Sequence, residues 1–567
     1  MSRNITSLSA RPDKELQDPL WERLQQAAEA NSGSPTAQAL TSIADDFLVG
    51  EAIAYGTSSF YDFLRRDHQG KRAYVCNGSS CLVAGTQDKV HRELRRHYQE
   101  EEIGHMCCLG RCHENSAFHL GGANYSGASI DRIDELVKEV KGQRSVSVRA
   151  GGDHHVGSTM AQPILTAPMP TLEEFYAVWE RVLRSDSADV LQEIQTATIR
   201  GRGGAGFPMG FKLAACREAE DSTGNGTRRK YIVCNADEGD PAAFSDRYLL
   251  EHRPHRVLLG MMIAGYCVGA DTGVLYIRAE YPEAVTVVKR AIAELQANGW
   301  IGTNIKGSGF NYRFKVIRAA GAYVCGEETA LLNSIEGKRG EVRTRPPYPA
   351  QQGLFNRPTV VSNVETLACV PWVIEHGGAA FARLGSEQSH GTKLVSLDSA
   401  FNRPGLYEVE YGTPLRTVID ELGQGFCRKV KALHIGGPLG GIVPLHRIDA
   451  LSIDFESFQR EGFLLGHASV LCIPEDFPMI DYLEHLFAFT AVESCGKCFP
   501  CRIGSKRGEE LIHGARTQDR RIDRALFNDL LETLEIGSLC ALGGGLPLGV
   551  KNALQYFSHE LDAHFQA

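Results

Sequence analysis

Hydrophobic positions in the first part of the chain recur with the spacing of a helix. Apolar residues three and four apart, as in LWERLQQAAEA and ALTSIADDFLV, lie on one helical face, and Ser34-Pro35 is typical of a helix start. Further along, short apolar runs such as RAYVCN and AFHLGG alternate with the helical stretches KVHRELRRHY and IDRIDELVKEV. We therefore predict a helical segment over residues 1–65 and a compact α/β domain of thioredoxin size over residues 66–145.

The pattern divides the rest of the chain into four parts. Residues 146–170 lack periodicity and are rich in Gly, Pro and small polar residues, which is typical of a linker. Residues 171–390 alternate amphipathic helices with apolar strands such as YIVCN and FKVIRAA, which predicts a layered α/β domain. Residues 391–475 are rich in strand patterns and predict a small α+β domain of ubiquitin-like type, whereas residues 476–567 predict a helical bundle. The predicted fold class is therefore a multidomain α/β protein.

Composition adds few constraints to this picture. The 567 residues are 43% hydrophobic and 23% charged, as in ordinary globular proteins. The net charge is -9 and no long basic run is present, so nucleic acid is not an expected partner. The longest apolar stretch, residues 257–270, is shorter than the roughly 20 residues of a membrane-spanning helix. We expect no transmembrane segment.

The sixteen cysteines constrain function most strongly. The chain is long and opens without an apolar leader, so a secreted disulfide scaffold is disfavoured and a cytoplasmic location is predicted. Eight cysteines are scattered singly in apolar surroundings, where Cys usually serves as a small core residue. The other eight form two closely spaced quartets, which are candidate metal sites.

The second quartet has the spacing of a cubane ligand set. Cys495, Cys498 and Cys501 form C-x2-C-x2-C, and Cys540 follows in GSLCALGGG. Three thiolates from one loop and a fourth from a distant segment can bind a [4Fe-4S] cluster. Zinc is the alternative, although structural zinc sites usually use two separated C-x2-C pairs. A thioredoxin-type redox pair at Cys495 and Cys498 is a further alternative, disfavoured by the helical surroundings.

The first quartet lies in the predicted thioredoxin-sized domain. Cys76 and Cys81 form C-x4-C, and Cys108 and Cys112 form C-x3-C. Two loops that each supply two thiolates can bind a [2Fe-2S] cluster. Cys107 is an alternative ligand to Cys108. We prefer Cys108, because the Leu-Gly turn leaves Cys107 pointing away. The other interpretation is a degenerate thioredoxin fold with incidental cysteines.

Three loops of the large α/β domain carry candidate ligand-binding groups. Gly201–Gly206 matches G-x-G-x-x-G, but a helix precedes it, so it is not a Rossmann turn. Glycines still allow close backbone approach to a phosphate or a flat ring, and Arg200, Arg202 and Lys212 add positive charge. The acidic loop NADEGDP follows the strand YIVC, at the end of a strand where α/β sheets bind ligands. The segment GAYVCGEET places two glutamates in the first turn of a helix, where the helix dipole alone would explain them.

Together these motifs resemble a known family. RGRGGAGFP, NADEGD, GAYVCGEETALL, EGKRG, RPPYP, NRPTVVSNVETL and ESCGKCFPCR are similar to the FMN-bearing, NADH-oxidising subunits of complex I, soluble NAD-reducing hydrogenases and NAD-dependent formate dehydrogenases. AYGTSSFYDFL and CLGRC resemble the thioredoxin-like [2Fe-2S] subunit that accompanies them, here fused to the same chain. CNADEGD, FSDR and GGPLGG resemble most closely the beta subunit of formate dehydrogenase.

The resemblance implies a set of site residues. It implies an FMN site formed by Gly201, Arg202, Gly203, Lys212, Asn235, Asp237, Glu238, Tyr323, Gly326, Asn363 and Thr366. It places Phe207, Glu328, Arg345 and Tyr348 in the NADH pocket, and Asp240, where complex I subunits usually have Glu, at the nucleotide ribose. Glu328 and Glu327 are the candidate catalytic residues.

The resemblance also implies a function. NADH gives up a hydride, whereas iron–sulfur clusters accept single electrons, so a flavin is needed between them. We expect a diaphorase subunit of a hetero-oligomer whose partner is a molybdenum- or tungsten-dependent formate dehydrogenase. The alternatives are a soluble [NiFe] hydrogenase as partner, or a non-catalytic electron-transfer scaffold.

Overall fold

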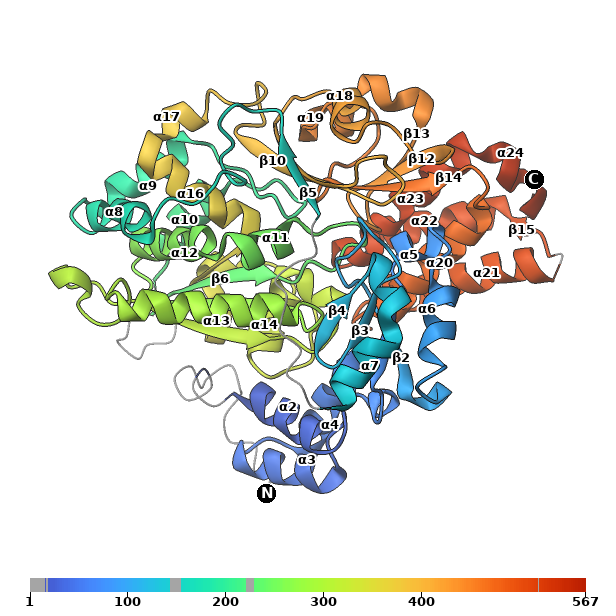
Figure 1. The fold of residues 1–567 in the computed structure, drawn as a ribbon, viewed down its shortest axis with the longest axis horizontal. Helices are drawn as coiled ribbons and strands as arrows, with labels where there is room; N and C mark the ends of the chain where they lie inside the picture. Colours follow the sequence, from blue (N-terminus) through green and yellow to red (C-terminus); the bar gives the residue numbers. More distant parts are fainter. Residues whose placement is uncertain (1–15, 17–18, 143–153, 221–228, 519, 567) are drawn as a thin grey trace.

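In the computed structural model, which describes residues 16, 19–142, 154–220, 229–518 and 520–566, a four-stranded parallel sheet forms the central unit (Figure 1). Its strands have the order β8-β7-β6-β9 and are β6 (Tyr231–Ala236), β7 (Thr272–Ile277), β8 (Arg313–Arg318) and β9 (Thr359–Asn363). Because all four strands are parallel, their carboxyl ends meet at one edge of the sheet. The surrounding helices include α8 (Leu172–Val182), α9 (Ser187–Thr196), α10 (Met209–Glu218), α11 (Ser245–His252), α12 (Pro254–Val268), α13 (Pro282–Ala297), α14 (Glu328–Ile335), α15 (Pro349–Gln352) and α16 (Val364–His376).

Both faces of this sheet are buried. Ile232 and Cys234 pack into the core that contains α12 and α16, whereas Tyr231 and Val233 face the opposite core, which contains α14. Successive residues of a strand point to opposite faces, so burial on both sides explains the continuous apolar run of β6.

The predicted N-terminal helices cover the second face of the sheet. Helices α2 (Leu20–Ala30), α3 (Ala37–Asp46) and α4 (Glu51–Ser58) form an arm below the sheet in Figure 1. The buried Trp21 donates from Nε1 to the carbonyl of Arg318 at 2.7 Å. The arm is therefore part of the central core, although residues 1–15 of the predicted segment lie outside the described residues.

The thioredoxin-like domain has a four-stranded sheet in the order β2-β1-β3-β4. Strands β1 (Ala73–Cys76) and β2 (Ile103–Met106) are parallel, and β3 (Phe118–Leu120) and β4 (Ala123–Tyr125) form an antiparallel hairpin. Its helices are α5 (Ser79–Val83), α6 (Gln87–Leu94) and α7 (Ile133–Lys141). The domain packs on the central unit, where Asn124 donates its backbone N–H to Glu283 Oε1 at 2.9 Å.

A third, mixed sheet departs from the predicted domain boundaries. It has the order β13-β12-β14-β10-β11-β5 and contains β10 (Thr392–Leu397), β11 (Gly405–Glu410), β12 (Val430–Ile435), β13 (Gly441–Pro444) and β14 (Ser469–Pro474). Strand β5 (His155–Ser158) comes from the predicted linker and pairs in parallel with β11. Residues 154–170 are therefore partly structured, because their backbone completes the edge of this sheet; residues 146–153 lie outside the described residues.

The C-terminal part is helical, as predicted, with one small exception. Helices α20 (Met479–Glu493), α21 (Ser505–Thr517), α22 (Arg524–Gly537), α23 (Ala541–Tyr556) and α24 (Ser558–Leu561) form the bundle. The short strands β15 (Ile522–Asp523) and β16 (Phe565–Gln566) pair in parallel beside it. Among the described residues, no helix combines the length and apolar character needed to cross a membrane. The α/β multidomain class is confirmed.

Candidate functional site

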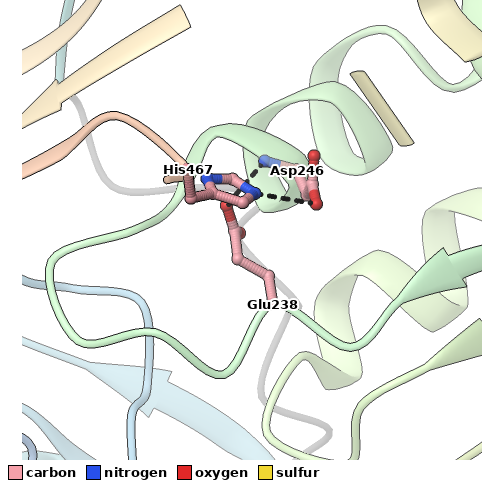
Figure 2. A group of neighbouring side chains, drawn as sticks. All are labelled: Glu238, Asp246 and His467. Atoms are coloured by element: carbon pink, nitrogen blue, oxygen red, sulfur yellow. Dashed lines mark hydrogen bonds and ion pairs between the residues drawn. The ribbon is translucent and has the colours of Figure 1, made fainter. Parts of the chain in front are cut away.

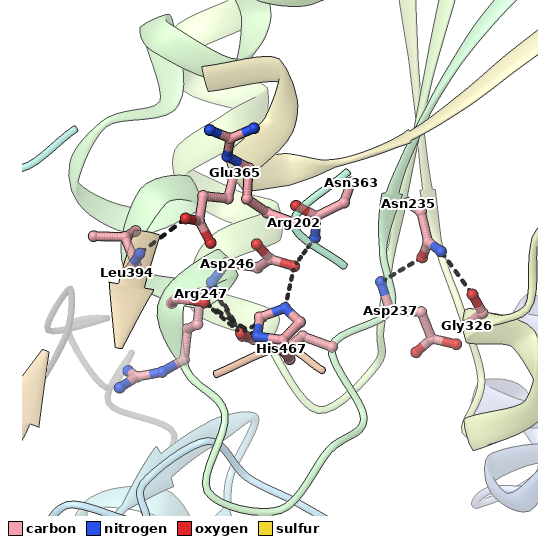
Figure 3. A network of polar contacts seen from close by, with 12 residues as sticks. Arg202, Asn235, Asp237, Asp246, Arg247, Gly326, Asn363, Glu365, Leu394 and His467 are labelled. Atoms are coloured by element: carbon pink, nitrogen blue, oxygen red, sulfur yellow. Dashed lines mark hydrogen bonds and ion pairs between the residues drawn. The ribbon is translucent and has the colours of Figure 1, made fainter. Parts of the chain in front are cut away.

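The predicted ligand loops meet at the carboxyl edge of the central sheet (Figure 3). Asn235 at the end of β6 lies opposite Asn363 at the end of β9 in the strand register. Asn235 Nδ2 donates to the carbonyl of Gly326 at 2.7 Å, which ties the loop after β6 to the segment after β8. The edge therefore brings together three segments that are far apart in the sequence.

The glycine loop packs against the same edge. The backbone N–H of Arg202 donates to Thr366 Oγ1 at 2.8 Å, and the Thr366 N–H donates to Asn363 Oδ1 at 3.2 Å. A Cβ on Gly203 would lie 3.1 Å from the Cβ of Asn363, so a glycine permits this close approach. The predicted FMN-binding residues of the loop and of β9 are thus in contact.

The side chains of Arg200 and Arg202 in this loop contact other groups of the protein, which the sequence did not predict. Arg202 is fully buried, and its guanidinium donates to the carbonyls of Arg200, His390 and Thr392. Arg200 is paired with Glu456. The expectation that the Arg202 side chain supplies positive charge for a phosphate is therefore corrected, whereas the side chains of Arg200 and Lys212 are 25% and 30% exposed and each pairs with a glutamate.

Asp237 carries an unsatisfied oxygen at the centre of the site. Its Oδ2 is buried and has no hydrogen-bond partner among the described residues. Burial raises the pKa of Asp237 to about 8, against the lowering effect of Arg278. A buried carboxyl group with an unpartnered oxygen fits a ligand that brings hydroxyl groups, which both donate and accept, such as the ribityl chain of FMN.

The next carboxylate, Glu238, belongs to a buried group that sequence reasoning missed. Glu238, Asp246 and His467 have side-chain atoms that all lie within 4.8 Å of one another (Figure 2). His467 Nε2 lies 3.3 Å from Asp246 Oδ2, across 221 residues of sequence. No pattern in the sequence around His467 predicted this contact, because its partners come from another domain.

Tyr323 connects the acidic loop to the helical bundle. Its hydroxyl donates to Asp240 Oδ1 at 2.6 Å, and its backbone N–H donates to Glu493 Oε2 at 2.9 Å. The ring packs edge-on against Phe489, with the ring centroids 4.9 Å apart. A Cβ on Gly239 would lie 2.4 Å from this ring, so the glycine is required by the packing.

The two candidate catalytic glutamates have different environments. Glu327 caps helix α14 by accepting from the backbone N–H groups of Thr329 and Ala330, both at 2.9 Å. Glu328 instead bridges two cations, with Lys212 Nζ at 3.0 Å and Arg345 Nη1 at 3.2 Å. The structure thus gives Glu327 a capping contact and places Glu328 with the predicted NADH-pocket residues.

Two aromatic rings of the predicted NADH pocket are exposed. Phe207 is 45% exposed and Tyr348 is 54% exposed. Lys212 Nζ lies 5.7 Å from the Phe207 ring centroid. Phe207 and Glu328 therefore both lie against Lys212.

The cysteines of the first quartet are all buried. Cys76 ends β1, Cys81 lies in α5, and Cys108 and Cys112 follow β2. Cys108 Sγ lies 3.3 Å from Cys112 Sγ. Cys107 is only partly buried, and its carbonyl accepts from Arg278 Nη2 at 2.7 Å. The four sulfurs on two loops fit the predicted [2Fe-2S] ligand set with Cys108 rather than Cys107.

The second quartet lies at the junction of the bundle with the central unit. Cys495 and Cys501 are buried, and Cys498 and Cys540 pack against the same core cluster. Cys501 lies in a turn of π-helix (Pro500–Gly504), and Cys540 precedes α23 at its N-cap. Three thiols on one loop and a fourth at a helix start fit the donor set of a [4Fe-4S] cluster.

The fold and site define an iron–sulfur flavoprotein that oxidises a nicotinamide nucleotide, and comparison with known proteins supports this class. Residues 194–372 match the family described as Nuo51 FMN-binding domain. Residues 481–564 match the NADH-ubiquinone oxidoreductase-F iron-sulfur binding region, and residues 10–141 match the thioredoxin-like [2Fe-2S] ferredoxin.

Individual relatives give the same result. The chain is 42% identical over 388 residues to the NADP-reducing hydrogenase subunit HndC of Solidesulfovibrio fructosivorans, covering 68% of this chain and 77% of that one. It is 31% identical to the NAD-reducing hydrogenase HoxS subunit alpha of Cupriavidus necator, over 88% of this chain and 84% of that one. A chain in the crystal structure of air-oxidised NAD+-reducing [NiFe]-hydrogenase superposes with a TM-score of 0.83 at 28% identity, covering 99% of this chain and 95% of that chain.

The chain belongs to the family of NADH-oxidising FMN and iron–sulfur subunits related to the complex I 51 kDa subunit, with a thioredoxin-like [2Fe-2S] domain. FMN, a [4Fe-4S] cluster, a [2Fe-2S] cluster and NADH are its cofactors and substrate. The predicted enzyme class, an NADH oxidoreductase, is confirmed. The closer relation to formate dehydrogenase stays a prediction.

Proposed function

We propose that this chain is the diaphorase subunit of a larger complex and that FMN lies at the carboxyl edge of the central sheet, between the two cysteine quartets. One observation carries this proposal: the loop after β6 contacts a cysteine of the first quartet and is linked through Tyr323 to Glu493, next to the second quartet. The Ala242 N–H donates to Cys112 Sγ at 3.2 Å. Asp240 accepts from Tyr323, whose N–H donates to Glu493, two residues before Cys495. A flavin held by this loop has a cluster site on either side.

The residues of the edge have distinct roles in this proposal. Bound FMN supplies hydride acceptance from NADH and the release of single electrons. Asn235 and Asp237 offer an amide and a carboxylate to the flavin's polar chain, and Gly203 allows its close approach to the backbone. Because the surrounding side chains are largely buried, they exclude water and hold the flavin in one orientation.

The exposed aromatic rings support an NADH site on the open side of the flavin. Phe207 and Tyr348 offer flat apolar surfaces for the rings of a nucleotide, and exposed rings of this size are otherwise unfavourable. Lys212 and Arg345 are positively charged and suit its phosphates, while Glu328 lies between them. These NADH contacts are part of the proposal.

An exposed apolar patch supports a partner surface beside the second quartet. Six large apolar side chains of the bundle are between 42% and 75% exposed, namely Val492, Phe499, Ile503, Leu526, Ile536 and Leu539. Phe499 lies within the loop that carries Cys498 and Cys501, and Leu539 precedes Cys540. The segments that carry Phe499 and Ile536 are neighbours, since a Cβ on Gly537 would lie 2.8 Å from Pro500 Cγ. Exposed apolar side chains on neighbouring segments usually mark an interaction site. A partner bound here would lie next to the [4Fe-4S] ligands, and electrons would pass across this surface.

Two partner modules are candidates. The motifs CNADEGD, FSDR and GGPLGG favour a molybdenum- or tungsten-dependent formate dehydrogenase. The match over nearly the whole chain to a subunit of an NAD+-reducing [NiFe]-hydrogenase favours a hydrogenase. Affinity purification of the native complex with metal analysis separates them, because molybdenum or tungsten indicates the first and nickel the second. A complex without any of these metals contradicts both. In either case we propose a cytoplasmic location.

The diaphorase role is tested on the purified chain. We expect FMN-loaded protein to reduce ferricyanide with NADH as donor. Protein that contains FMN and both clusters but does not react with NADH would support the non-catalytic electron-transfer scaffold instead.

A further inference from the structure

A buried charged group joins the third domain to the flavin site. His467 lies just before β14 in the mixed-sheet domain, whereas Glu238 and Asp246 lie in the loop after β6 and in α11 (Figure 2). The three residues are 6%, 4% and 2% exposed. His467 Nε2 lies 3.3 Å from Asp246 Oδ2 and 3.6 Å from Glu238 Oε1. Two carboxylates and an imidazole are also a set of residues that can bind a metal ion.

The hydrogen bonds of Glu238 argue against a metal at this position. Glu238 Oε1 accepts from Ser245 Oγ at 3.2 Å and from the Asp246 N–H at 3.0 Å. Its Oε2 accepts from the Arg247 N–H at 3.1 Å and from the Tyr281 hydroxyl at 3.2 Å. Four donors occupy the lone-pair sites of a carboxylate. The charge of the buried carboxylates is therefore balanced by a positively charged side chain rather than by a metal ion, and the His467 imidazole supplies that charge.

The same group is connected to the glycine loop. Asp246 Oδ2 accepts from Asn363 Nδ2 at 2.6 Å (Figure 3). Asn363 caps α16 by accepting from the Thr366 N–H, and Thr366 Oγ1 accepts from the Arg202 N–H. A displacement of Asp246 would thus be transmitted to the backbone of the loop.

We propose that His467 is a positioning residue for FMN: as an imidazolium it holds Asp246 and Glu238 together and so fixes the two loops that bind the flavin. This inference rests on the flavin position proposed above. It also assigns a role to the mixed-sheet domain, which supplies a cation to a site built by the central domain. The approach is close, because a Cβ on Gly437 in the mixed-sheet domain would lie 2.4 Å from the Cγ of Asp240 in the loop after β6.

The charges around His467 favour its protonated form. The carboxylates that face it are Asp246, Glu238 and, more distantly, Asp240, and the facing cation is Lys393 on β10. Burial and Lys393 lower the pKa of His467, but Asp246 and Glu238 outweigh them and raise it to about 9. Because the folded-state pKa is raised, the stabilisation is present at neutral pH and is lost as the pH rises through about 9.

The test is FMN affinity of the full chain after removal and re-addition of flavin, measured by quenching of flavin fluorescence. We expect His467→Gln to weaken binding on the order of tenfold, because one charge of a buried pair is left unpartnered. Asp246→Asn added to His467→Gln removes that unpaired charge and should restore most of the affinity. Unchanged affinity in His467→Gln, or no rescue in the double variant, overturns the proposal.

Two further measurements complete the test. Wild-type affinity should fall as the pH passes about 9, and the fall should be absent in His467→Gln; identical pH profiles contradict the proposal even if the variant folds poorly. Gly203→Val serves as the control for the flavin position, because its side chain would collide with Asn363. If Gly203→Val binds FMN normally, the flavin position is wrong and the proposal fails with it. If Gly203→Val loses FMN and His467→Gln retains it, the proposed flavin position stands and the proposed role of His467 is wrong.

Discussion

Adjacent residues with the same charge perform different tasks in this protein. Glu327 and Glu328 both lie at the start of α14, yet Glu327 folds back to cap the helix and Glu328 extends to Lys212 and Arg345. The difference arises from the backbone, since an N-cap residue has extended geometry and can reach its own helix N–H groups. Glu327 also lies 3.8 Å from Arg345 Nη1, but Glu328 is the one of the two that pairs with both Lys212 and Arg345.

At this scale we predict that Glu328→Gln raises the midpoint potential of the bound flavin. Reduction adds negative charge to a flavin, and removing a nearby carboxylate makes that addition easier. The effect should be on the order of 1 kcal/mol, because Glu328 is partly exposed and screened. A spectroscopic redox titration measures it, with Glu341→Gln, on a surface pair with Arg339, as the control. An unchanged potential in Glu328→Gln contradicts this electrostatic role.

A second prediction separates two neighbouring cysteines. Cys108→Ser should lose the electron paramagnetic resonance signal of the reduced [2Fe-2S] cluster, because Cys108 Sγ lies 3.3 Å from Cys112 Sγ. Cys107→Ser should keep the signal and the iron content. The reverse result would make Cys107 the ligand.

At the scale of elements, a single buried carboxylate orders the segment that joins two domains. Glu408 on β11 accepts from the backbone N–H groups of Ile164, Leu165 and Thr166 at 2.8 to 3.0 Å. It also accepts from the Thr392 hydroxyl at 2.9 Å. These bonds explain why a segment without periodicity is held against a sheet: its donors are satisfied by a side chain.

We therefore predict that Glu408→Gln destabilises this segment. The amide nitrogen of glutamine would face N–H groups, and the loss should be on the order of 3 kcal/mol. Thermal denaturation and limited proteolysis between residues 154 and 170 measure it. Glu410→Gln is the matched control, since Glu410 lies on the same strand and its carboxylate accepts, among the described residues, a single 3.3 Å bond from the Gly385 N–H. Equal melting temperatures for the two variants would contradict the role of Glu408.

At the scale of the whole molecule, the loop after β6 is the point where the domains converge. The thioredoxin-like domain reaches it through Cys112, the bundle through Glu493 and Tyr323, and the mixed-sheet domain through His467. Among the exposed apolar side chains, those beside the second quartet lie on the bundle. In the proposal above, the flavin occupies this buried centre and a partner binds the separate surface on the bundle.

For this surface we predict that Ile536→Asp weakens association with the partner module about tenfold, as for a central interface residue. Ile536 is 75% exposed, so the change should leave the FMN content intact. Retention of the partner in affinity purification measures the effect. Leu48→Asp, which changes an exposed residue of the N-terminal arm, is the control. Full retention of the partner by Ile536→Asp would place the interface elsewhere.

Much of the site was predictable because it follows local rules. The apolar run YIVC predicted strand β6, and a polar loop at its carboxyl end predicted a ligand edge. The N-terminal helices were predicted from their periodicity, but their packing on the central sheet was not. The charge of Arg202 was not predicted correctly from the sequence, because its guanidinium donates to the backbone carbonyls of residues 390 and 392, which lie far along the chain.

The sequence by itself determined the spacing of the cysteines, most helices and strands of each domain and the family, because these depend on neighbours within a few residues. The tertiary structure alone decided that Glu328 pairs with Lys212, that Arg202 is buried and that His467 meets Asp246. Those outcomes depend on contacts between distant segments. Such contacts form when loops close and domains pack, and no local pattern of residues specifies them.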